Sequence, residues 1–148
     1  MNIPDETNIK SLRMGKGVIN GIGKELGKFV VFTMEIPWKV SKDFIGANSE
    51  KVVMVESVEE HWLEEQISAM PECNTVVGIG GGQAIDAAKH MSWKRGIRLV
   101  SIPTILSVDA FVTPAAGIRR NHVVVYIGQS SPDPLSIDYN VIRTAAAE

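Results

Sequence analysis

The sequence predicts a single α/β domain in which helices cover both faces of a mostly parallel, doubly wound sheet. Three observations support this fold class. Short apolar runs alternate with runs of helical period, the connections between them are short, and 45% of the 148 residues are hydrophobic. Short strand–helix–strand connections imply parallel pairing through right-handed crossovers. No repeat or internal linker divides the chain, so residues 1–148 are expected to form one domain.

The first elements follow from the positions of glycine and proline. A short helix-like stretch is expected over 18–26, because glycines flank it, and a strand follows over 28–33. Pro37 suits the first turn of a helix, since its missing N–H would be unbonded there in any case. The apolar spacing then predicts a helix over 38–45, which Gly46 ends.

A strand and an amphipathic helix are expected next. Residues 52–55 have the composition of a buried strand, and residues 58–70 have apolar side chains at helical spacing. The glutamates of this helix are interpreted as a solvated face. The side chains expected to point inward are Trp62, Leu63 and Ile67, and those expected to point outward are Glu59, Glu60, Glu64 and Glu65.

The third unit contains a glycine-rich turn. A strand over 75–79 passes through this turn into a helix over about 83–94, and a strand over 98–102 follows. Small residues give this helix a face that can lie close to a sheet. They are Ala84, Ala87 and Ala88.

The last quarter of the chain departs from the alternation. Residues 116–119 and 122–128, joined by Arg120-Asn121, predict a β-hairpin, which an otherwise parallel sheet tolerates at an edge. Residues 135–138 predict a short strand, and a helix is expected to begin near 141–143.

Composition excludes several classes of function. A net charge of −2 and the lack of a Lys/Arg cluster argue against a nucleic-acid partner. No apolar run approaches the roughly 20 residues that cross a bilayer, and the first residues lack a signal-peptide pattern, so a cytoplasmic protein is expected. The single cysteine, Cys73, is expected to be an inert thiol. The histidines, expected to be ordinary surface or packing residues, are His61, His90 and His122.

The glycine turn, residues 78–82, is the most informative local feature. Backbone N–H groups and the positive end of a helix converge there, and glycine lets a phosphate approach the backbone closely. The spacing matches neither the Rossmann fingerprint nor a P-loop, and a purely structural tight turn remains the alternative. Asp86 and Lys89 lie three residues apart in the following helix. They are interpreted as a helix-surface pair at least as readily as a functional one.

A second polar segment follows the strand over 98–102. Ligands of open parallel sheets bind outside the carboxyl ends of the strands. The hydroxyls of Thr104 and Ser107 and the carboxylate of Asp109 are therefore expected to face the same crevice as the glycine turn. Thr113 would join them if the segment turns helically. The alternative is that Ser107 or Asp109 caps a helix that begins near residue 110.

Two motifs at this separation resemble a known superfamily. Residues 78–89, GIGGGQAIDAAK, and residues 103–109, PTILSVD, are similar to those of iron-containing alcohol dehydrogenases, glycerol dehydrogenases, glycerol-1-phosphate dehydrogenases and dehydroquinate synthases. Residues 109–116 look closest to glycerol-1-phosphate dehydrogenases. The stretch 95–97 and Leu106 resemble dehydroquinate synthases. The resemblance covers about residues 12 to 145.

The resemblance implies a role for each matching position. The residues implied to hold the diphosphate of NAD or NADP are Gly81, Gly82, Gln83, Ala84, Ile85 and Asp86. Those implied to line the nicotinamide side are Thr104, Ile105, Leu106, Ser107 and Thr113. Asp109 is implied to meet a substrate hydroxyl. Glu35 stands near the position where family members often place an aspartate for the adenosine ribose, so the choice between NAD and NADP stays open.

The resemblance also implies a second half. In these enzymes a helical C-terminal domain holds a divalent metal (Zn, Fe or Ni), and that domain is expected to be absent from this chain. We therefore expect a truncated NAD(P)-binding domain with no catalytic or metal-ligating residue, inactive in isolation. The full-length enzyme would oxidise or reduce a small polyol or polyol phosphate. The alternatives are a dehydroquinate-synthase-like lyase, a split subunit that a partner completes, and a non-catalytic dinucleotide-binding module. A homo-oligomer is a further expectation.

Overall fold

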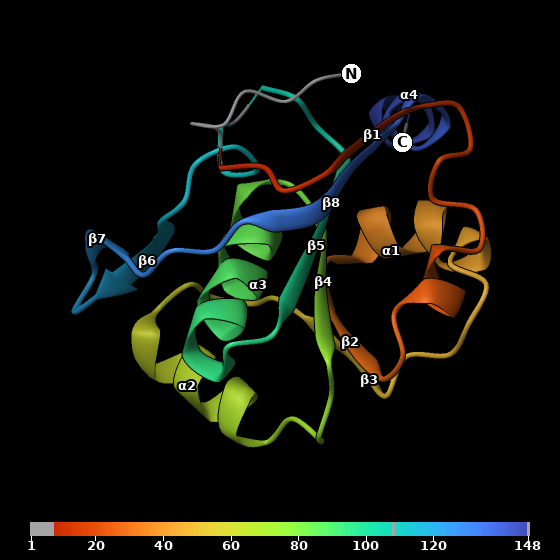
Figure 1. Ribbon diagram of the computed structural model, residues 1–148. Helices are drawn as coiled ribbons and strands as arrows, with labels where there is room; N and C mark the ends of the chain where they lie inside the picture. The colour runs from red at the N-terminus through yellow and green to blue at the C-terminus, as the bar shows by residue number, and fades with distance from the viewer. Residues whose placement is uncertain (1–7, 108, 148) are drawn as a thin grey trace.

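The computed structural model describes residues 8–107 and 109–147 (Figure 1). A six-stranded sheet crosses the molecule, helices lie on both of its faces, and a two-stranded ribbon stands to one side. Within these ranges no helix has the length and apolar character that crossing a membrane requires. In chain order the elements are β1 (Leu12–Gly15), η1 (Ile22–Glu25), β2 (Phe29–Thr33), α1 (Glu35–Ser41), η2 (Lys42–Phe44), β3 (Lys51–Met54), α2 (Glu60–Ser68), β4 (Thr75–Gly80), α3 (Gly82–Arg95), β5 (Arg98–Pro103), β6 (Ala116–Arg120), β7 (Val123–Ile127), β8 (Pro132–Asp138) and α4 (Tyr139–Ala147).

The sheet has the strand order β1-β8-β5-β4-β2-β3, and its strand pairs are all parallel. The α/β class predicted from strand–helix alternation is confirmed. Phe32 pairs with Gly78, and Gly80 pairs with Pro103, so the carboxyl ends of β2, β4 and β5 lie at one edge of the sheet. This register positions the segments that follow those three strands next to one another.

Each face of the sheet has its own apolar core. On one face Val76 and Phe32 pack with the small side chains of α3, and on the other Val77 and Val31 pack with Val40 of α1. Every residue of β2 and β4 is buried, which is the reason these strands show continuous apolar runs rather than alternation. The small face predicted for α3 is confirmed, since its three alanines are fully buried against the sheet.

The N-terminal part differs from the prediction. The helix-like stretch over 18–26 shrinks to one short 3₁₀ helix, η1. Gly17 and Gly21 adopt left-handed backbone angles, with φ of +72° and +74°, and such residues interrupt a helix. Strand β1 was not predicted. Its pairing partner β8 lies far along the chain, so only tertiary structure reveals it.

The hairpin forms as predicted but not where it was expected. Strands β6 and β7 make a separate two-stranded sheet, whereas the edges of the main sheet are β1 and β3. Ala116 and Ile118 bury their side chains in the core beside α3, which holds the ribbon against the helix layer instead of the sheet edge. The turn is also shifted by one residue, because Asn121 and His122 take the positive φ angles.

The glutamates of α2 are more than a solvated face. Glu60 pairs with Arg120 of the hairpin at 2.7 Å, and Glu64 pairs with Lys94 of α3 at 3.0 Å. Trp62, Leu63 and Ile67 contribute to the core as predicted. Partial burial of the glutamates therefore arises from ion pairs that tie α2 to both of its neighbours.

Candidate functional site

The glycine turn joins the carboxyl end of β4 to the first turn of α3. Gly80 ends the strand with φ of +144°, in the backbone region that favours glycine. Gly81 precedes the helix and has no side chain to cap it, so N–H groups of the first turn lack an intrahelical partner. A Cβ added at Gly82 would meet nothing within 4 Å. The turn therefore presents backbone donors beside open space, as an anion site requires.

The strand order reverses at this turn. The chain passes from β2 to β3 through α1 on one face, and from β4 to β5 through α3 on the other (Figure 1). Open α/β sheets bind ligands at such reversals. The Thr33 hydroxyl donates to the carbonyl of Ile79 at 2.9 Å, which ties the ends of β2 and β4 together. Glu35, exposed, begins α1 at the same edge, and its ribose-binding role stays a prediction.

The segment after β5 lies against the glycine turn. The N–H of Thr104 donates to the carbonyl of Gly80 at 3.0 Å, and the Thr104 side chain is buried. A Cβ placed on Gly81 would lie 3.3 Å from Cγ2 of Ile105. Leu106 and the neighbouring Ser107 are exposed at this edge. Two motifs far apart in the sequence are thus brought together as expected.

A single helical turn follows. The N–H groups of Val112 and Thr113 both donate to the carbonyl of Asp109, at 3.0 and 3.1 Å. The segment therefore makes the helical turn that was the condition for Thr113 to join Thr104, Ser107 and Asp109. In the described part of this segment no helix begins near residue 110, so neither Ser107 nor Asp109 acts as a helix cap there. The side chain of Asp109 stays exposed.

Lys89 departs most from the sequence expectation. The interpretation of Asp86 and Lys89 as a helix-surface pair is wrong, because the Lys89 side chain is only 1% exposed. Its Nζ donates to the Ala110 carbonyl at 2.7 Å and to Oγ1 of Thr113 at 3.2 Å, and lies 3.3 Å from Oδ1 of Asp86. The sequence carries a signal for this burial: Lys89 follows the buried Ile85 by four residues and so shares its helix face.

Burial perturbs both members of this pair. Desolvation raises the pKa of Asp86, while Lys89 and the Gly117 N–H oppose that rise. Desolvation also lowers the pKa of Lys89, and Asp86 opposes it. Each charge is thus stabilised mainly by the other. The Asp86 carboxylate is already engaged by Lys89 and by the hairpin backbone, and the N–H of Ile85 donates to the Gly81 carbonyl.

The histidines lie apart from one another. His61 and His122 are exposed beside Glu65 and Glu59, and His90 is fully buried in α3, with Nε2 3.3 Å from Glu64. Over the described ranges, no three His, Cys, Asp or Glu side chains gather as a metal site would require. Partial burial raises the pKa of the Cys73 thiol, which disfavours the reactive thiolate.

The burial of His90 predicts a pH dependence of stability. Desolvation lowers the pKa of His90 below its usual value, against an opposing effect of Glu64. As the pH falls from about 7 to about 5, the unfolded chain takes up this proton before the folded chain does, so the free energy of unfolding falls. We expect His90→Phe to remove part of that fall in urea titrations. Met91→Leu, on the same helix, is the control, and an unchanged pH slope in His90→Phe would contradict the assignment.

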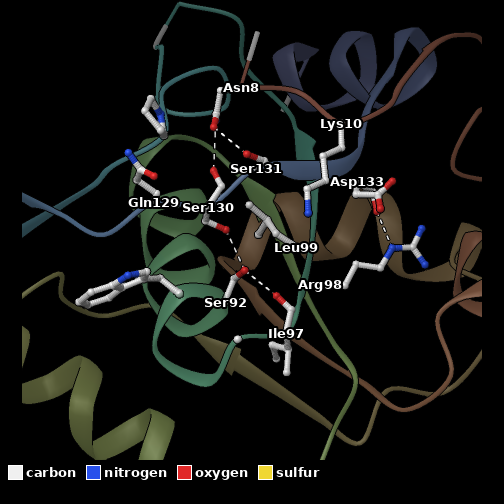
Figure 2. Close-up of a pocket in the computed structure, with 13 residues that line it drawn as sticks. Asn8, Lys10, Ser92, Ile97, Arg98, Leu99, Gln129, Ser130, Ser131 and Asp133 are labelled. Atoms are coloured by element: carbon white, nitrogen blue, oxygen red, sulfur yellow. Dashed lines mark hydrogen bonds between the residues drawn. The ribbon is translucent and has the colours of Figure 1, made fainter. Parts of the chain in front are cut away.

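A large pocket lies elsewhere on the molecule (Figure 2). It has a volume of about 870 Å³ and lies between the C-terminal end of α3, the start of β5 and the segment before β8. Ser130 donates to Ser92, and Ser131 donates to Asn8, so its walls are hydrogen-bonded internally. It contains none of the residues that the sequence predicted for a cofactor or substrate. At the predicted site the described residues leave open space beside Gly82, where an added Cβ would meet no atom within 4 Å.

The fold and this edge define a class: a doubly wound parallel α/β domain with a glycine turn at its strand reversal. The chain belongs to the iron-containing alcohol dehydrogenase family, whose model matches residues 32–146. This establishes the superfamily inferred from the two motifs.

Individual relatives agree with this assignment. The glycerol-1-phosphate dehydrogenase [NAD(P)+] of Sulfurisphaera tokodaii is 29% identical, over 92% of this chain and 42% of its own length. Among solved structures, glycerol dehydrogenase from Schizosaccharomyces pombe matches 90% of this chain and 38% of its own, with a TM-score of 0.77 and 20% identity. Sulfoacetaldehyde reductase from Bifidobacterium kashiwanohense, in complex with NAD+, matches 96% and 47%, with a TM-score of 0.73 and 15% identity. The structural likenesses establish the fold, and the chain spans less than half of each relative.

Proposed function

We propose that this chain is the nucleotide-binding half of an NAD(P)-dependent, metal-containing dehydrogenase that acts on a small polyol or polyol phosphate. Family membership supports the class of reaction. The curated relatives named glycerol-1-phosphate dehydrogenase [NAD(P)+] support the substrate class and the cofactor. The proposal includes a small-molecule substrate and a cytoplasmic location. It includes no nucleic-acid partner, in keeping with the net charge of −2.

One observation carries the proposal: the uncapped N-terminus of α3 lies at the strand reversal with open space beside Gly82. A diphosphate there would accept hydrogen bonds from the N–H groups of Gly82 and Gln83, and the positive end of the 14-residue helix would favour its charge. Ala84 and Ile85 are fully buried, so they would support the turn by packing. The residues present therefore fit a dinucleotide.

The other roles follow from the position of each segment. The exposed side chains of Ile105, Leu106 and Ser107 would line the nicotinamide side, with Thr104 fixing the segment to Gly80 and Thr113 beyond it. Asp109 would accept a hydrogen bond from a substrate hydroxyl. Its carboxylate is exposed and the described residues offer no metal cluster, so a metal would need ligands outside them. When bound, such an ion would polarise the substrate oxygen.

Titration with NADH tests the proposal. We expect the 148-residue chain to bind NADH saturably, with a Kd no weaker than about 1 mM, and the nicotinamide fluorescence to rise as water is displaced. NMNH, which lacks the adenylate and has only one phosphate, should bind more weakly because it leaves part of the glycine turn unoccupied. Lack of binding at millimolar NADH would contradict the proposed cofactor site.

A further inference from the structure

The buried ammonium of Lys89 connects helix α3 to the turn at 109–113. Within 3.5 Å of its Nζ lie the Ala110 carbonyl, Oγ1 of Thr113 and Oδ1 of Asp86. Two of these three oxygens belong to the turn, and the third belongs to the helix itself. The Lys89 side chain is only 1% exposed, so its charge is stabilised by these partners rather than by bulk water.

Asp86, the other member of the pair, contacts the start of strand β6. The Asp86 carboxylate interacts with the Gly117 N–H at the start of the hairpin, and a Cβ added at Gly117 would lie 3.3 Å from Oδ2 of Asp86. The Asp86–Lys89 pair thus joins α3, the turn and strand β6.

We infer that Lys89 is a positioning residue, which fixes the turn carrying Asp109 and Thr113 relative to the glycine turn at the start of the same helix. The inference rests on the proposed function and adds to it a residue that makes no contact with the ligand. One helix then holds both walls of the site: its first turn presents backbone donors, and its buried lysine holds the opposite segment in register.

A purely stabilising role explains the arrangement less well. Removing two charges from water costs free energy that a buried ion pair regains only in part, and apolar side chains of similar volume often stabilise as well or better. Among the described residues, two backbone hydrogen bonds lie within the turn at 109–113, from the N–H groups of Val112 and Thr113 to the Asp109 carbonyl. The Lys89 ammonium instead fixes the position of the turn, because its three N–H donors require the Ala110 carbonyl and the Thr113 hydroxyl to lie at hydrogen-bonding distance.

The test compares Lys89→Met with Met91→Ala, which truncates a fully buried side chain of the same helix in the apolar core. Both variants are expected to lower the melting temperature. In Lys89→Met we expect the Kd for NADH to rise about tenfold. This corresponds to a turn that adopts the binding arrangement in about a tenth of the molecules. Amide exchange at Thr113 should accelerate by a similar factor. Met91→Ala, measured well below its melting temperature, should keep the wild-type Kd and the wild-type exchange rate.

An unchanged Kd and unchanged exchange at Thr113 in folded Lys89→Met would overturn the inference. Should that variant not fold, the double variant Asp86→Asn, Lys89→Met removes both charges with little change of shape, and the same two readouts decide. The exchange measurement needs no cofactor. If wild-type protein fails to bind NADH, the proposed function falls, whereas exchange at Thr113 still shows whether Lys89 fixes the turn.

Discussion

Replacing Gly82 with aspartate is expected to abolish NADH binding while leaving the chain folded. The added carboxylate would occupy the open space beside the first turn of α3, where the cofactor diphosphate is proposed to lie. Two like charges at about 4 Å repel strongly in a partly desolvated site, so the Kd should rise by at least about a hundredfold. An aspartate in the first turn of a helix is favourable by itself, and stability should therefore hold or increase.

Gly82→Ala is the matched control for this experiment. Its methyl group enters the same open space without a charge, so it measures the steric part of the effect alone. Its Kd should rise less than that of Gly82→Asp, and the difference between the two variants reports the charge repulsion. Fluorescence titration and thermal melts of both variants separate binding from folding. Equal affinity in wild type and Gly82→Asp would place the cofactor elsewhere on the chain.

Replacing Gly78 with valine is expected to cause the largest loss of stability among these variants. A Cβ at Gly78 would lie 2.8 Å from Cβ of Ala88 and 3.2 Å from Cα of Ile85, so α3 would have to move away from the sheet. Overpacking of this kind costs about 3 kcal/mol, a large part of the stability of a typical domain. Urea unfolding followed by circular dichroism measures the change.

Intrinsic propensity predicts the opposite sign at this position. Valine favours strands and glycine disfavours them, so a chain without the close helix contact would be stabilised by Gly78→Val. Gly78→Ala combined with Ala88→Gly relieves the 2.8 Å contact and should be more stable than Gly78→Val. Wild-type stability in Gly78→Val would show that α3 does not pack on β4 at this distance.

Sequence patterns predict the elements whose signals are local. Strands β2, β4 and β5 and helix α3 match their predicted ranges within about two residues, because continuous apolar runs and helical spacing are properties of neighbouring residues. Strand β1 and the placement of the hairpin depend on partners far along the chain. The 3₁₀ helix η1 depends on the positive φ angles of glycines, which the sequence permits but does not require.

In the candidate site, too, local sequence patterns predict some features and miss others. Glycine spacing and the polar segment after β5 locate the edge of the sheet where the site lies, and Ile105 indeed lies beside Gly81. The burial of Lys89 was missed because a lysine three residues after an aspartate usually marks an exposed helix face. Its position four residues after Ile85 indicated burial instead, because residues four apart lie on the same face of a helix, and Lys89 is buried with Ile85.

The position of the bound cofactor tests the central proposal most directly. A 16.1 kDa chain suits ¹⁵N-resolved NMR, in which each backbone amide reports its own surroundings. On addition of NADH, the largest shifts are predicted at the amides of Gly81, Gly82 and Gln83. Shifts confined to Gly96 and Gln129, which line the large cavity at the other end of α3, would contradict the assignment of the glycine turn as the dinucleotide site.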